Sequence, residues 1–130
     1  MNNRYTLKAA ESLRHASEIA DMLGHSYVGS EHLLIGLIQT EGSLASAVLV
    51  NNGVTEDRTI NLVYELIAPD SSIAIKDEVG YTPRLMHILD AAAKEAARFK
   101  EKSIGTEHLL IALMKETEGV ASRLLNTMGV

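Results

Sequence analysis

Apolar residues recur three and four positions apart along most of the chain, which is the pattern of helices with one buried face. The first such stripe follows Thr6, a residue favoured at helix N-caps, and stops before Gly24. It consists of Ala9, Leu13, Ala16, Ala20 and Leu23. A second stripe follows Thr82 and Pro83, a pair suited to the cap and to the first helical position. It consists of Leu85, Leu89, Ala92, Ala96 and Phe99.

Each of these two helices is followed by a segment that is apolar on nearly all sides. The segments have closely related sequences, Gly-Ser-Glu-His-Leu-Leu-Ile-Gly-Leu at 29–37 and Gly-Thr-Glu-His-Leu-Leu-Ile-Ala-Leu at 105–113. Ser30 and Thr106 are their predicted N-caps. A helix that is apolar all round is normally covered on most sides, so we predict that these two helices form the centre of the molecule.

Two further kinds of helix complete the pattern. A third helix is expected in both halves and carries paired apolar residues, Leu44-Ala45 and Val48-Leu49 in one half and Val120-Ala121 and Leu124-Leu125 in the other. A fourth helix is expected after Thr55, and Pro69 ends it. Its predicted buried face consists of Ile60, Val63, Tyr64 and Ile67. No alternating run of apolar and polar residues marks a strand, so the pattern predicts an all-α fold of about seven helices.

The two halves are copies of one unit. Residues 5–54 align with residues 81–130 at a constant offset of 76 (81 − 5), and 17 of those 50 positions are identical. We therefore expect two tandem pseudo-symmetric repeats packed as one domain over 1–130, with repeat one at 5–68, a linker at 69–80 and repeat two at 81–130. Repeat two is truncated, because it stops at Val130 where repeat one goes on into a fourth helix. We expect the chain to be part of a longer one.

Charge and composition narrow the classes of partner. Seventeen acidic and 12 basic residues give a net charge of −5, which disfavours binding to nucleic acid or to an anionic membrane surface. No apolar run approaches the roughly 20 residues that a membrane span needs, and the polar N-terminus is unlike a signal peptide. With no cysteine, disulfides and thiolate metal sites are excluded. We expect a cytoplasmic protein with neither nucleic acid nor membrane among its partners.

The duplicated glutamates and threonines are the candidate ligand-binding residues. Glu31 and Glu107 stand at the start of the central helices, where a carboxylate is favoured by the helix dipole but can also accept a guanidinium. Thr6 and Thr82 are natural caps, and a helix start with a free hydroxyl and N–H groups can also hold an anion. Both roles stay open for each residue. A ligand that carries both charges would suit such a site.

Other polar residues are predicted to be structural. His32 and His108 lack the spacing of metal ligands, so we expect hydrogen-bonded core histidines and no metal site. His15, His25 and His87 have no counterpart in the other repeat and are expected on the surface. The charged run 94–102, which includes Glu95, is typical of a solvated, salt-bridged helix face. No phosphate-binding loop or nucleophile motif is present, so we expect no catalytic residue in this chain.

Several of these stretches are similar to a known family. Tyr-Thr-Pro-Arg at 81–84, Leu-Gly-His-Ser-Tyr-Val-Gly-Ser-Glu-His-Leu-Leu at 23–34 and the paired Gly-[Ser/Thr]-Glu-His-Leu-Leu resemble the N-terminal repeat domain of Clp proteins. The resemblance covers nearly the whole chain. Both repeats keep the Glu-His pair and an aromatic-Thr start, which is more similar to the ClpC type of Gram-positive bacteria than to ClpA or the ClpB disaggregase.

The resemblance implies a regulatory domain ahead of two AAA+ ATPase modules, which form a ring hexamer, unfold substrates and pass them to the ClpP peptidase. ATP would bind those modules, which are absent here, so no cofactor is expected in this chain. The resemblance also implies binding of arginine-phosphorylated or unfolded proteins and of MecA-like adaptors. The phosphoarginine guanidinium would meet Glu31 in one site and Glu107 in the other, while Thr6 and Thr82 with nearby helix-start amides would hold the phosphate.

Two other hypotheses stay open at this point. The chain could be an adaptor-docking or ring-regulating interaction domain without a phosphoarginine site, in which case changing Glu31 and Glu107 would leave binding unaltered. A small metal-dependent hydrolase that uses Glu and His would require bound metal in the purified protein.

Overall fold

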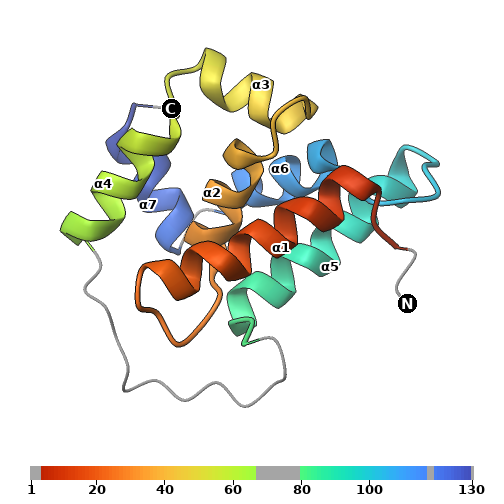
Figure 1. The fold of residues 1–130 in the computed structure, drawn as a ribbon. Coiled ribbons are helices and arrows are strands. Elements are labelled where there is room, and N and C mark those ends of the chain that lie inside the picture. Colours follow the sequence, from red (N-terminus) through yellow and green to blue (C-terminus); the bar gives the residue numbers. More distant parts are fainter. Residues whose placement is uncertain (1–3, 67–79, 117–118, 130) are drawn as a thin grey trace.

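The computed structural model describes residues 4–66, 80–116 and 119–129, which fold into seven helices (Figure 1). The helices are α1 (Leu7–Met22), α2 (Ser30–Gln39), α3 (Leu44–Asn51), α4 (Glu56–Leu66), α5 (Pro83–Arg98), α6 (Thr106–Lys115) and α7 (Val120–Thr127). Within these ranges no strand forms, and the only β-type pairing is two isolated bridges. The predicted all-α fold is therefore confirmed.

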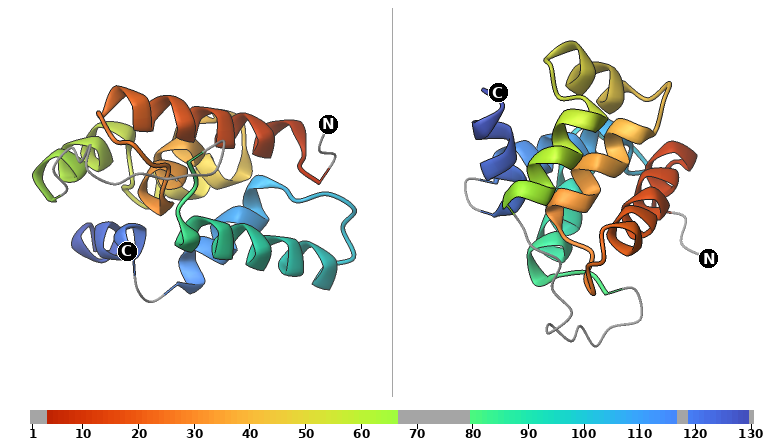
Figure 2. Two further views of the ribbon diagram at one scale, coloured as in Figure 1. Left: turned by 90° about the horizontal axis from the view of Figure 1, so that it is seen from below. Right: turned by 60° about the vertical axis from the view of Figure 1, so that its left-hand side comes forward.

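The order of helices shows the duplication directly. Helices α1, α2 and α3 return as α5, α6 and α7, and α4 has no second copy among the described residues. Helices α2 and α6 lie in the middle, with α1 packed against α2 and α5 against α6 (Figures 1 and 2). The central position predicted for the two apolar segments is correct, since α2 is buried from Ser30 to Ile38.

A close backbone approach explains how α1 can lie so near α2. A Cβ atom at Gly36 would stand 2.4 Å from the carbonyl oxygen of Ser12 and 3.0 Å from the amide nitrogen of Ala16. Only glycine fits there without moving a backbone. No single helix in the described ranges is long and apolar enough to cross a membrane, and α2 with α3 reaches that length only as a pair bent by 98°.

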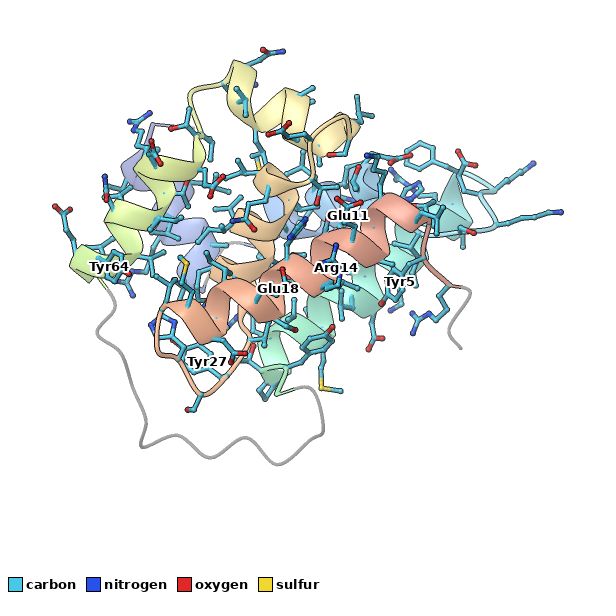
Figure 3. The ribbon with its side chains drawn as sticks, viewed as in Figure 1. Tyr5, Glu11, Arg14, Glu18, Tyr27 and Tyr64 are labelled. Carbon is cyan, nitrogen blue, oxygen red and sulfur yellow. The ribbon has the colours of Figure 1, made fainter. Side chains whose placement is uncertain are left out.

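Helix α4 packs on α2 and α7 through Thr59 and Val63, which are both buried. Tyr64 was predicted for the same face, but its side chain is 56% exposed and lies at the outer end of α4 (Figure 3). The prediction that Tyr64 belongs to the buried face of α4 is therefore wrong. Ile67, Pro69 and the predicted linker, apart from Gly80, lie outside the described residues.

The charged run on α5 also differs from its prediction at one position. Glu95 is 8% exposed rather than solvated. It accepts a hydrogen bond from the Lys115 ammonium and forms a 3.4 Å ion pair with Arg98. The hydrogen bond from Lys115 lowers the pKa of Glu95 below its usual range. The alternation of charges in sequence did not reveal that α6 brings a lysine to this face.

Helix caps agree with prediction at α1 and α5 but not at α2 and α6. Thr6 accepts a hydrogen bond from the Ala9 amide and Thr82 from the Leu85 amide, both at 3.1 Å. The N-caps of α2 and α6 are Gly29 and Gly105, not Ser30 and Thr106. A glycine has no side chain to cap with, so the third helical residue closes each start. His32 Nδ1 accepts from the Gly29 amide and His108 Nδ1 from the Gly105 amide, both at 2.8 Å.

The two repeats are joined by a symmetric exchange of main-chain hydrogen bonds. The Thr6 amide donates to the Ile104 carbonyl at 2.9 Å, so the start of α1 is tied to the loop before α6. The Thr82 amide donates to the Val28 carbonyl at 2.9 Å, so the start of α5 is tied to the loop before α2. Each repeat therefore places its first helix start against the central helix start of the other.

Candidate functional site

A small cavity forms where three helix starts meet. Its volume is about 180 Å³. Helix α2 comes from repeat one, whereas α5 and α7 come from repeat two. The lining residues are Tyr27, Gly29, Ser30, Glu31, Thr82, Arg84, Gly119 and Val120. Two predicted site residues, Glu31 and Thr82, therefore share one cavity, although they belong to different repeats. The sequence alone left that pairing open.

The Glu31 carboxylate is folded back over the start of its own helix. A Cβ atom at Gly29 would stand 2.5 Å from Glu31 Oε1, so a residue larger than glycine would push the carboxylate away. Glu31 Oε2 accepts a hydrogen bond from the Tyr27 hydroxyl at 3.1 Å. The side chain is only 2% exposed, and this burial raises the pKa of Glu31, while a backbone hydrogen bond at the helix start and the Tyr27 hydroxyl oppose the rise.

Thr82 lines the same cavity, and its hydroxyl group can act as a hydrogen-bond donor there. Its hydroxyl oxygen already accepts the Leu85 amide as the cap of α5. A hydroxyl has one donor hydrogen besides its acceptor lone pairs, so Thr82 can cap α5 and still donate to an anion. Because α5 begins here, the positive end of its dipole points toward the cavity.

Arg84 adds a positive charge that was not among the predicted site residues. Its guanidinium donates to Glu116 at 2.6 Å. Its side-chain stem packs against Gly119, where a Cβ atom would stand 2.8 Å from Arg84 Cδ and where φ is +107°. Glycine is thus required at 119 for two reasons. The signal that could have found Arg84 was its place in the Tyr-Thr-Pro-Arg stretch.

Ser30 and Thr106 connect the repeats instead of capping their own helices. The Ser30 hydroxyl accepts the Ala121 amide of α7 at 3.2 Å, and Gly119, the N-cap of α7, has no side chain to do so. Thr106 stands in the matching place, 3.5 Å from the Ala45 amide of α3. These bonds hold the third helix of each repeat beside the candidate site of the other.

The other two predicted residues, Thr6 and Glu107, occupy the pseudo-symmetric position. Thr6 caps α1 and is tied to the loop that leads to Glu107. Lys8 takes the place of Arg84 and donates to the Glu41 carbonyl at 3.0 Å. Glu107 also folds over a glycine, with Oε1 2.5 Å from a Cβ atom placed at Gly105. Unlike Glu31 it is partly exposed.

His25 is buried, contrary to the predicted surface position, and it pairs with His32. His25 Nδ1 lies 2.7 Å from His32 Nε2. Since His32 Nδ1 accepts the Gly29 amide, His32 Nε2 must carry the proton and donate it to His25. Burial, with a smaller effect of His25, lowers the pKa of His32 to about 3. The ligand atoms of His25, Glu31 and His32 lie within 4.8 Å of one another, but this pattern leaves His32 no lone pair for a metal ion.

Comparisons of the sequence with known proteins agree on one family. Residues 4–128 match the Clp repeat (R) N-terminal domain. The ATP-dependent Clp protease ATP-binding subunit ClpC of Staphylococcus epidermidis is 39% identical over 124 residues, and that of Staphylococcus aureus is 40% identical over the same length. These matches cover 93% of the chain but only 15% and 14% of the two relatives.

Solved structures share the fold. The N-terminal domain of the chaperone ClpD from Arabidopsis thaliana has a TM-score of 0.78 at 21% identity, and the match covers 98% of this chain and 86% of that one. The N-terminal domain of Hsp104 from Candida albicans has a TM-score of 0.72 at 16% identity, covering 97% and 82%. The chain therefore belongs to the Clp repeat N-terminal domain family.

Proposed function

We propose that this chain is the substrate- and adaptor-recognition domain of a ClpC-like ATP-dependent unfoldase, and that it binds arginine-phosphorylated proteins at two equivalent places. Glu31 with Thr82 forms one site, and Glu107 with Thr6 forms the other. Membership of the Clp repeat N-terminal domain family and the similarity to ClpC proteins support the general role. The phosphoarginine ligand is the finer part of the proposal and rests on the chemistry of the cavity.

The observation that carries the proposal is the pairing of opposite charges in one small cavity. Glu31 offers a carboxylate, while Arg84 and the Thr82 hydroxyl offer donors beside the helix starts. A phosphoarginine side chain presents a guanidinium and a phosphoryl group next to each other. Carboxylates pair with guanidinium groups through two parallel hydrogen bonds, and helix starts with basic side chains hold phosphates. Few other protein modifications carry both charges so close together.

The size of the cavity agrees with a single modified side chain. Pockets for drug-sized ligands measure roughly 300–1,000 Å³, whereas this one measures about 180 Å³. It has room for a charged head group and not for a folded peptide. Selection of a substrate would therefore depend on the modification, with the flanking residues outside the cavity contributing less.

The ATPase modules and the peptidase that this role requires are not part of this chain. We infer that the parent is a cytoplasmic AAA+ ring hexamer that binds ATP in separate modules and delivers unfolded substrates to ClpP. MecA-like adaptors would dock on this domain. No step of catalysis is assigned to the residues of this chain.

Calorimetric titration of a phosphoarginine peptide into the domain tests the proposal. Two binding events are expected, with Glu31→Ala and Glu107→Ala each removing about one and the double variant removing both. The same peptide with unmodified arginine should not bind, and Glu65→Ala, an exposed glutamate on α4, should bind like the wild type. A folded wild-type domain that does not bind the peptide would contradict the phosphoarginine assignment.

One observation favours the alternative of a docking domain without such a site. Helices α3 and α6 leave an apolar cavity of about 190 Å³ at the surface, where Val48 is 42% and Met114 is 47% exposed. By the pseudo-symmetry this face matches the one that α4 covers on α2 and α7. A further helix, from the parent chain or from an adaptor, would fit there. Val48→Glu and Met114→Glu should then abolish docking without changing peptide binding.

A further inference from the structure

The two candidate sites differ at one position that touches the carboxylate. Tyr27 in repeat one corresponds to Ser103 in repeat two at the offset of 76. The Tyr27 hydroxyl donates to Glu31 Oε2 at 3.1 Å. Among the described residues, no side chain donates to Glu107, and its carboxylate is partly exposed. Glu31 and Glu107 therefore hold the same position in their repeats but differ in burial and in hydrogen bonding.

Tyr27 is held in place by a series of contacts that ends in the core. Its ring stacks on His25, with centroids 5.2 Å apart and planes 8° apart. His25 is hydrogen-bonded to His32, and His32 to the start of α2. Figure 3 shows Tyr27 in the loop between α1 and α2. Repeat two has Glu101 in place of His25, and Glu101 is exposed, so no comparable support exists there.

Both carboxylate oxygens of Glu31 already lie against other protein groups. A guanidinium that pairs with a carboxylate in the bidentate manner needs both oxygens. Oε1 lies over Gly29, and Oε2 is taken by the Tyr27 hydroxyl. A guanidinium that pairs with both oxygens therefore has to replace the hydrogen bond from the Tyr27 hydroxyl. At Glu107 no such replacement is required.

We propose that Tyr27 is a gate that makes the Glu31 site the weaker of the two, so that the Glu107 site fills first. The inference rests on the proposed phosphoarginine function. A hydrogen bond to a charged group is worth about tenfold to a hundredfold in an equilibrium constant, and the ligand must replace this one. The Glu31 site should therefore bind at least about tenfold more weakly than the Glu107 site.

The test uses single-site backgrounds and a phosphoarginine peptide of fixed sequence. Glu107→Ala leaves only the Glu31 site, and Glu31→Ala leaves only the Glu107 site, so calorimetry gives each dissociation constant separately. In the Glu107→Ala background, Tyr27→Phe keeps the ring and its stacking but removes the hydroxyl. We expect it to tighten binding about tenfold. Tyr27→Ser, which copies repeat two, should tighten binding in the same direction if circular dichroism shows it folded.

The matched control is Tyr64→Phe, an exposed tyrosine on α4 that should leave both constants unchanged. A purely structural role for Tyr27 would lower the melting temperature of Tyr27→Phe without tightening binding. Equal constants in the two backgrounds, or weaker binding by Tyr27→Phe, would overturn the gate and leave the proposed function standing. Absence of binding in the wild type and in every variant would overturn both.

Discussion

Glu31 carries a carboxylate that is almost fully buried beside a helix start and a tyrosine hydroxyl. Its raised pKa means that the folded chain favours the protonated form more than the unfolded chain does. Between the ordinary pKa of a glutamate and the raised value, the folded chain therefore binds more protons. Stability falls as the pH rises through that interval, so the ionised carboxylate weakens the fold at neutral pH.

Glu31→Gln is expected to raise the free energy of unfolding at pH 7, because it removes a buried charge while keeping a similar shape. Phosphoarginine binding at this site should fall at least about tenfold, since the charge-assisted pair is lost. Urea unfolding of the variant and the wild type at pH 7 and at pH 4 measures the effect. The stability difference should shrink at pH 4, where the wild-type carboxyl is also protonated.

Glu107→Gln is the matched comparison, because Glu107 has the same place in its helix but is partly exposed. Its effect on stability should be smaller. Destabilisation by Glu31→Gln at pH 7 would show that helix-start electrostatics outweigh the cost of burial, and would return Glu31 to a structural role.

Some features of single residues depend on the local sequence, and others depend on contacts between helices. Thr6 and Thr82 were correctly predicted as caps, because capping depends on the nearest four residues. His25 was wrongly placed on the surface, since the lack of a counterpart in repeat two gave no hint that it receives a hydrogen bond from His32. The burial of Glu95 depends on Lys115, twenty residues away on another helix. Local patterns do not encode such contacts.

At the scale of elements, the packing of α1 on α2 depends on the absence of one methyl group. Gly36 lies inside α2, where glycine costs roughly 1 kcal/mol relative to alanine. Its neighbours are backbone atoms of α1, which cannot rotate away as a side chain can. In repeat two the same position is Ala112, which is buried, so α5 and α6 accommodate the methyl group that α1 and α2 exclude.

Gly36→Ala is expected to destabilise the domain by up to about 2 kcal/mol, because a steric cost of roughly 1–3 kcal/mol opposes a gain of about 1 kcal/mol in helix propensity. Thermal unfolding followed by circular dichroism measures the net effect. Ala112→Gly is the reciprocal variant and should lose about 1 kcal/mol through propensity alone. A rise in melting temperature for Gly36→Ala would show that α1 can shift outward at little cost.

The seven helices that the described residues form were expected from the apolar pattern of the sequence. Their exact starts were less predictable, as at α2 and α6, because Gly-Ser and Gly-Thr both offer a plausible serine or threonine cap. The choice is made by His32 and His108, whose rings reach back to the glycine amide. Ser30 is then free to bond α7 of the other repeat. The third helical residue, and not the serine or threonine, thus decides where each helix starts.

At the scale of the whole molecule, the candidate sites are composite. The duplication could be predicted from the sequence, but not that Thr82 would line the same cavity as Glu31 of the other repeat. That arrangement follows from two main-chain hydrogen bonds between the repeats. One runs from the Thr82 amide to the Val28 carbonyl, and the other from the Thr6 amide to the Ile104 carbonyl. Helix α2 of repeat one and helix α6 of repeat two are both buried in the middle of the molecule. Separating the two repeats would therefore expose apolar surface on each of them.

Two separate peptides, residues 4–66 and residues 80–130, are therefore expected to be largely unfolded alone and to regain helicity when mixed at equal concentration. Circular dichroism of each peptide and of the mixture measures this, and gel filtration gives the stoichiometry. The mixture of a Gly36→Ala first peptide with the second should regain less. Two halves that fold independently and bind the ligand alone would contradict composite sites.

The exchange of helix starts between the repeats also links recognition to assembly. A ligand that bridges Glu31 and Thr82 binds only when the two halves are docked, so its binding energy is added to the energy that holds them together. A ligand present at 100 times its dissociation constant adds about 2.7 kcal/mol per site. The bound ligand would then stabilise the docked arrangement of the two repeats. The domain would therefore resist separation of its halves most strongly while a ligand is bound.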